Sequence, residues 1–143
     1  MQRPQVKGAR MAYWLMKSEA EVFSWDDLVR DGKTEWDGVR NYTARQNLAA
    51  MKLGDEAFFY HSNDQKAVVG IMRVSREGQP EGEDGKWVSV EMKPVGPVKR
   101  PVTLAEIKAE PKLAEMALVK LSRLSVGPVT AAEWKLVSKM AGL

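Results

Sequence analysis

The segment from Trp36 to Asn63 reads WDGVRNYTARQNLAAMKLGDEAFFYHSN. It begins with a turn at Gly38, continues into a helix whose predicted N-cap is Asn41, and ends in an apolar strand from Glu56 to His61. It also contains the only histidine of the chain and two of its three phenylalanines. Aromatic and hydrogen-bonding side chains therefore gather at the ends of predicted elements, where binding sites usually form.

Predicted strands and a predicted helix flank this segment. The sequence predicts a short buried strand over Ala12–Lys17 and a helix over Ser24–Arg30, which a capping box begins. Two further strands are predicted, Ala67–Ser75 and Lys86–Val95, the latter with a clear alternation of apolar and polar residues. Gly70 interrupts the first of these strands and indicates a bulge or a close backbone approach.

The rest of the chain is predicted to be less regular. Residues 76–86 read as a loop rich in Gly and Glu, and the prolines at 94, 97 and 101 indicate a connector. Capping boxes at Thr103 and Thr130 predict two more helices, and residues 123–129 are expected to be extended. Strands dominate the middle without a repeating strand–helix order, which favours an α+β fold with a mostly antiparallel, curled sheet.

The length of 143 residues fits one domain. We expect a flexible N-terminal extension over residues 1–11 and a single domain over residues 12–143. Residues 1–10 are basic and polar, without the apolar stretch of a secretory signal, and no apolar run approaches the ~18 residues of a membrane span. A cytoplasmic location and no membrane partner are the simplest expectations.

The composition excludes several classes of site. The chain has no cysteine and one histidine, so thiolate zinc sites, cysteine nucleophiles and histidine-rich metal sites are not expected. Phosphate-binding loops and dinucleotide, zinc-protease and EF-hand motifs do not occur. We therefore expect no metal and no cofactor. The net charge of +3 fits an anionic partner and equally an ordinary soluble surface.

Four features of the sequence are candidates for a binding site, and each has a structural alternative. Trp36 offers an indole that can stack on a base, or it can fill the bottom of a barrel. The pair Arg40-Asn41 can orient a phosphate or a base edge, although Asn41 can simply cap the helix. The run His61–Asn63 offers groups that read a base edge, or it forms a polar turn. Glu19 is the one acid–base candidate, but no second carboxylate is placed with it by spacing.

Several stretches of this chain resemble motifs of the EVE domain family, in order and at compatible spacing from about residue 12 to about residue 140. They read YWLMKSE at 13–19, WDGVRNY at 36–42, FFYHSN at 58–63, RLSV at 123–126 and EW at 133–134. The chain departs from the family pattern at Ala20 and Gly127, and residues 78–86 form a shorter segment than in the family.

The resemblance implies a PUA-like fold, a curled β-barrel flanked by short helices and related to PUA, ASCH and YTH domains. It also implies a domain without catalytic activity or metal that binds nucleic acid, DNA or RNA, and recognises a modified base, with modified cytosine in DNA favoured. The implied pocket residues are Lys17, Ser18, Trp36, Val39, Arg40, Asn41, His61, Ser62, Asn63, Leu124 and Ser125. Two alternatives stay open: an accessory factor or enzyme in RNA modification, and a small-molecule sensor that uses the same pocket.

Overall fold

A computed structural model of the protein describes residues 11–63 and 65–143. Its elements in chain order are β1 (Tyr13–Glu19), α1 (Trp25–Asp31), β2 (Thr34–Trp36), α2 (Tyr42–Ala50), β3 (Glu56–Ser62), β4 (Ala67–Glu81), β5 (Trp87–Thr103), α3 (Leu104–Ala109), the 3-10 helix η1 (Pro111–Leu113), α4 (Ala117–Lys120), β6 (Val126–Val129) and α5 (Ala131–Met140). The predicted extension over residues 1–11 lies, except for Met11, outside the described residues.

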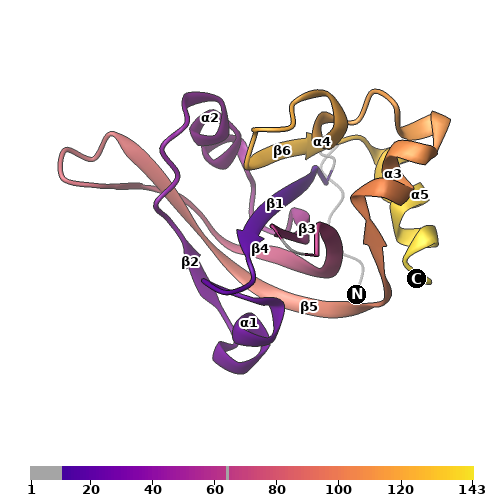
Figure 1. The fold of residues 1–143 in the computed structure, drawn as a ribbon. Coiled ribbons are helices and arrows are strands. Elements are labelled where there is room, and N and C mark those ends of the chain that lie inside the picture. Colours follow the sequence, from indigo (N-terminus) through magenta and orange to yellow (C-terminus); the bar gives the residue numbers. More distant parts are fainter. Residues whose placement is uncertain (1–10, 64) are drawn as a thin grey trace, which may run out of the picture.

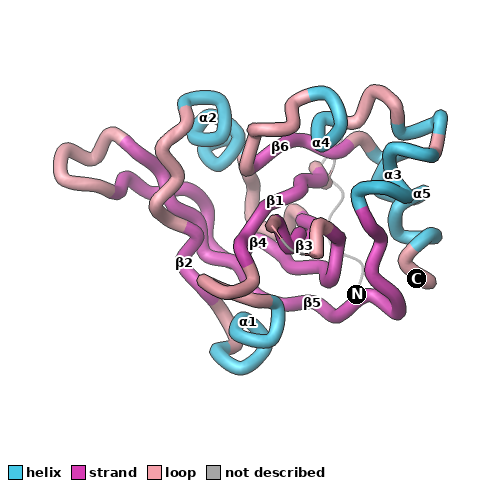
Figure 2. The backbone as a smooth tube through the Cα atoms, viewed as in Figure 1, coloured by secondary structure: helices cyan, strands magenta, loops and turns pink. Residues whose placement is uncertain are grey.

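The strands form one curled sheet in the order β2-β5-β4-β3-β1-β6 (Figures 1 and 2). The pair β1–β3 is parallel and the other pairs are antiparallel. Because β2 and β6 are the two ends of this order, the sheet curls without closing. The short helices lie around it, with α3, α4 and α5 gathered at one end (Figure 1). The expected α+β fold, with a mostly antiparallel curled sheet flanked by short helices, is confirmed.

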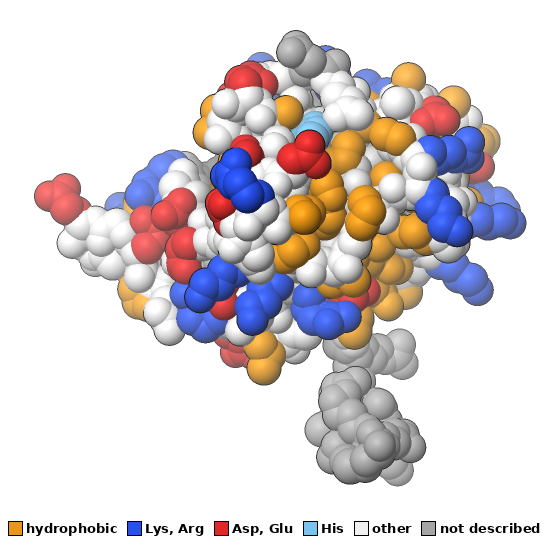
Figure 3. All heavy atoms as spheres, turned by 90° about the horizontal axis from the view of Figure 1, so that it is seen from below, with side chains coloured by type: hydrophobic (Ala, Val, Ile, Leu, Met, Phe, Trp, Pro, Cys, Tyr) orange, Lys and Arg blue, Asp and Glu red, His pale blue; other side chains and the backbone are white. Residues whose placement is uncertain are grey.

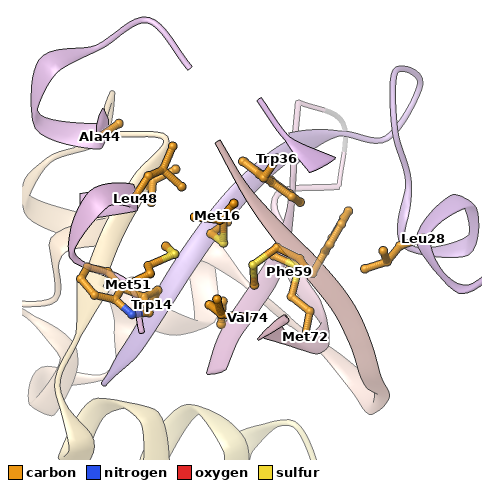
Figure 4. Close-up of a cluster of buried hydrophobic side chains, with 14 of the residues drawn as sticks. Trp14, Met16, Leu28, Trp36, Ala44, Leu48, Met51, Phe59, Met72 and Val74 are labelled. Carbon is orange, nitrogen blue, oxygen red and sulfur yellow. The ribbon is translucent and has the colours of Figure 1, made fainter. Parts of the chain in front are cut away.

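Two hydrophobic clusters lie on the two faces of this sheet. Trp14, Met16 and Phe59 belong to the first cluster, together with residues of α1 and α2 (Figure 4). Leu15, Phe58 and Tyr60 belong to the second, which α3 and α5 complete. Successive residues of β1 and β3 thus enter opposite clusters. A strand that is buried on both faces needs apolar side chains at every position, which explains the continuous apolar run of β3.

The predicted helix starts are confirmed by their hydrogen bonds. Ser24, Thr103 and Thr130 each accept a bond from the backbone N–H three residues later, and the acidic residue at that position bonds back. Asn41 Oδ1 likewise accepts a bond from the N–H of Ala44, at 2.9 Å. These bonds satisfy amide groups that the first turn of a helix leaves without partners.

Three stretches differ from the sequence prediction. Trp36 ends the short strand β2 instead of lying in a loop. Strand β4 continues to Glu81, so most of the predicted 76–86 loop belongs to a long hairpin that projects from the body (Figure 1). Strand β5 continues through all three prolines to Thr103. Among the described residues, β2 pairs only with Val90–Met92 of β5, so no strand pairs with the later part of β5 on that edge, where proline is tolerated.

Candidate nucleic-acid binding site

A hollow of about 570 Å³ opens where the C-terminal end of β1 faces β2. This hollow, called the pocket below, lies between β2, at one open end of the sheet, and β1, which is next to the last strand at the other end. Its lining residues are Lys17, Ser18, Glu19, Val22, Phe23, Thr34, Glu35, Trp36, Asp37, Gly38, Val39, Arg40 and Ser125. Its volume falls within the range of small-molecule sites.

Backbone and hydroxyl contacts bring distant residues to this pocket. The N–H of Lys17 donates to the carbonyl of Ser125 at 2.9 Å, which extends the pairing of β1 and β6 and places Ser125 beside Lys17. Ser18 Oγ donates to the carbonyl of Phe23 at 2.6 Å and fixes the turn that follows β1. The sequence separation of Lys17 and Ser125 shows why spacing alone could not join them.

Trp36 lies in the core and also lines the pocket. Its side chain is only 9% exposed, and its ring meets Phe59 edge-on with centroids 5.6 Å apart. The core role foreseen as the alternative for Trp36 is therefore real, but the residue keeps a surface toward the pocket. A base in the pocket would contact an indole that the protein already holds in place.

The wall formed by residues 37–40 is held by the projecting hairpin. Glu81 Oε2 accepts bonds from the N–H of Gly38 at 3.0 Å and from Arg40 Nη1 at 2.7 Å. Arg40 Nη2 reaches the second carboxylate oxygen of Glu81 at 3.2 Å, and its guanidinium lies 5.2 Å from the centroid of the Trp87 ring. Arg40 is thus an ion-paired and stacked part of the wall, instead of a freely solvated side chain.

Charged groups of both signs line the pocket. Burial lowers the pKa of Lys17, whose Nζ donates to the carbonyl of Ser122 at 2.9 Å. The hydrogen bonds from Arg76, with a smaller contribution from Ser89, lower the pKa of Glu35, so this carboxylate stays ionised. Glu19 and Asp37 add two more carboxylates to the lining. Sequence spacing did not reveal that Glu35 and Asp37 accompany Glu19, although both flank the predicted Trp36.

Five of the predicted pocket residues lie outside the lining. Asn41 caps α2, and with Leu124 it lines a neighbouring hollow. The other three are His61, Ser62 and Asn63, at the end of β3. The structure thus brings six predicted residues together, Lys17, Ser18, Trp36, Val39, Arg40 and Ser125.

The ring of His61 has partners within the protein at both nitrogens. The N–H of Trp25 donates to His61 Nε2 at 3.1 Å, so the proton of a neutral ring lies on Nδ1, 2.8 Å from Gln65 Oε1. Asn63 Nδ2 donates to Glu21 Oε1 at 2.8 Å. These contacts fix α1 and the turn after β1, and they support the pocket from behind its lining.

The surface around the fold carries both signs of charge. On the face shown in Figure 3, Lys and Arg side chains are interspersed with Asp and Glu around a central group of hydrophobic side chains. This face therefore carries a mixed surface instead of a patch of one sign. In residues 11–63 and 65–143, no helix is long and apolar enough to cross a membrane.

Comparison with known proteins gives consistent matches. The family model of the EVE domain matches residues 12–140. A Rhodopseudomonas palustris protein solved by NMR is 55% identical, with a TM-score of 0.89 over 92% of this chain and 94% of that one.

Human thymocyte nuclear protein 1 is 37% identical over 162 residues, which cover 88% of this chain and 72% of the relative. The crystal structure of human THYN1 in complex with 5-methylcytosine-containing DNA has a TM-score of 0.86 and covers 92% of this chain and 98% of that one. A YTH domain from Zygosaccharomyces rouxii shares 14% identity and a TM-score of 0.57 over 92% of this chain and 86% of that one, a likeness of fold alone.

Proposed function

Because this chain belongs to the EVE domain family, we propose that it is a non-enzymatic nucleic-acid-binding domain that takes a modified base, with modified cytosine in DNA favoured, into the pocket. The observation that carries the proposal is the 570 Å³ hollow beside Trp36, which six of the predicted residues line. The similar human THYN1 structure, a complex with 5-methylcytosine-containing DNA, supports the choice of ligand.

The side chains of the pocket suit a flat base that carries hydrogen-bond donors. Phe23, Val39 and Trp36 supply apolar surface for the ring and for a methyl group. Glu19 and Asp37 supply acceptors for an exocyclic amine such as that of cytosine. Stacking on an aromatic side chain is worth about 1–3 kcal/mol per base, which offsets much of the few kcal/mol that taking a base out of a duplex costs.

A second candidate, an enzyme or accessory factor in RNA modification, is favoured by one observation. Lys17, whose pKa burial lowers, lines the same pocket as Glu19, so an amine and a carboxylate share one site. Incubation of the protein with modified RNA, followed by mass spectrometry of the nucleosides, separates a binding domain from an enzyme. A binding domain leaves the nucleosides unchanged, whereas an enzyme alters their masses.

A cytoplasmic location remains a prediction from the sequence.

The proposed function is tested by titrating the protein with two oligonucleotides that differ only in one 5-methylcytosine. We expect tighter binding of the modified strand. The variant Ser125→Phe places a ring in the pocket while keeping the backbone carbonyl that Lys17 uses, so it should remove the preference. Free 5-methylcytidine is included as a competitor, because a small-molecule sensor would bind it without any oligonucleotide.

The control variant Lys108→Gln changes an exposed residue of α3, at the opposite end of the molecule from the projecting hairpin (Figure 1). It should keep the preference of the wild type. Equal affinity for both oligonucleotides, unchanged by Ser125→Phe, would reject the base-reading proposal.

A further inference from the structure

A second hollow of about 340 Å³ adjoins the pocket. This side groove is lined by Asn41, Thr43, Leu121, Ser122, Arg123 and Leu124. Consecutive residues divide the two hollows, since Arg40 and Ser125 line the pocket whereas Asn41 and Leu124 line the side groove. A nucleic-acid strand that leaves the pocket past Arg40 and Ser125 therefore reaches the residues of the side groove.

Both walls of the side groove are held in place. The N–H of Leu124 donates to the carbonyl of Leu121 at 2.9 Å and closes a tight turn. Lys17 Nζ donates to the carbonyl of Ser122 at 2.9 Å, so a residue of the pocket also fixes this turn. On the other wall, α2 is fixed to β6, because Asn47 Nδ2 donates to the carbonyl of Val126 at 2.7 Å.

The two hollows differ in the charges that line them. The pocket lining carries three carboxylates, those of Glu19, Glu35 and Asp37, against the two cations Lys17 and Arg40, so its net charge disfavours a phosphate inside it. The side groove has no carboxylate among its lining residues, and it offers the guanidinium of Arg123 with the hydroxyls of Thr43 and Ser122. Arginine and hydroxyl side chains are common partners of phosphate oxygens. The charges thus direct the base to one hollow and the backbone to the other.

We propose that the side groove binds the sugar–phosphate of the nucleotide next to the base held in the pocket. Arg123 contacts the phosphate, and Leu121, whose side chain is 53% exposed, packs against the sugar. This inference rests on the proposed function, since it needs a nucleic acid whose base occupies the pocket. It adds a subsite that carries affinity without reading the base.

The test measures how the affinity for the modified and the unmodified oligonucleotide depends on salt. The variant Arg123→Gln should reduce the slope of log K against log salt by about 0.9 for a duplex or about 0.7 for a single strand, the loss of one phosphate contact. Both affinities should fall by the same factor, so the preference for the modified base stays unchanged. Arg123→Lys, which keeps the charge, should retain most of the slope.

Lys108→Gln is the matched control, because it removes one positive charge from an exposed position on α3. It should leave the slope as in the wild type. If Arg123→Gln behaves like this control while the wild type still prefers the modified base, the side-groove proposal is wrong and the proposed function stands. If the wild type shows no preference for the modified base, or binds neither oligonucleotide, both proposals fail.

Discussion

Trp36 contributes to the core as well as to the pocket, so its removal has two effects. The residue is 9% exposed and packs edge-on against Phe59 within the first cluster. We expect Trp36→Ala to lower the free energy of unfolding by about 3–5 kcal/mol, the usual cost of deleting a buried aromatic ring. Urea unfolding followed by circular dichroism measures this loss.

Trp36→Phe retains a ring against Phe59 and should lose less stability than the alanine variant. A loss below 1 kcal/mol for Trp36→Ala would mean that the indole is not packed as described. Binding assays on the alanine variant thus report on the fold as well as on the site, which is why Ser125→Phe is the better probe of the pocket.

His61 is expected to stabilise the protein without reading a base. His61→Phe leaves the N–H of Trp25 without its acceptor, and an unsatisfied buried donor costs about 1–3 kcal/mol. The variant should therefore unfold at lower urea concentration, while the ratio of affinities for modified and unmodified oligonucleotides stays as in the wild type. A lost preference in a variant that is still folded would return His61 to the base-binding residues.

At the scale of elements, the hairpin of β4 and β5 controls one wall of the pocket through Glu81. The bonds from Arg40, and then that from the N–H of Gly38, lower the pKa of Glu81 below its ordinary range. The stabilisation from these contacts is therefore complete above the ordinary pKa of a glutamate, and it is lost as the pH falls through the lower value of the folded protein. The wall should be intact at neutral pH.

An NMR titration of the Gly38 amide tests this contact. Its chemical shift should change with a midpoint below the ordinary range of glutamate, and Glu81→Gln should abolish that change because no carboxylate remains to titrate. A midpoint in the ordinary range would show that Glu81 does not hold the wall. The hairpin would then have no direct part in shaping the pocket.

Local sequence signals predicted which helices and strands occur better than they predicted where each one ends. The capping boxes at Ser24, Thr103 and Thr130 were readable because side chain and amide lie three residues apart in the sequence. Gly70 was also readable, since a register shift follows Val68 and a Cβ at this position would meet the Trp25 ring at 2.5 Å. The prediction ended strand β5 too early, near its prolines, because only the sheet order shows that no strand pairs with its later part on one edge.

The site was less predictable, because its parts meet only through long-range pairing. The motif around Trp36 indicated one wall, whereas Ser125 reaches the pocket through its bond to Lys17. Glu35 and Asp37 flank Trp36 in the sequence, but nothing local shows that they face Glu19 across the pocket. The partners of His61 could not be read from the sequence either, since a lone histidine at a strand end gives no sign that Trp25 and Gln65 contact its ring nitrogens.

At the scale of the whole molecule, one sheet joins the two clusters. Alternate residues of β1 and β3 belong to opposite clusters, so neither cluster can form without the strands of the other. The pocket lies against the first cluster, whereas α5 covers the second. A ligand bound in the pocket should therefore stabilise both sides of the molecule to the same extent.

Hydrogen exchange with and without the modified oligonucleotide tests this linkage. At a free ligand concentration of 100 times Kd, binding to the folded state alone adds about 2.7 kcal/mol to the free energy of unfolding. We expect this gain for amides in α2, which packs on the first cluster, and equally for amides in α5, wherever exchange requires global unfolding. Ser125→Phe should show the gain in neither helix. A gain confined to α2 would mean that the two sides unfold separately, and the shared strands would then not make the protein one cooperative unit.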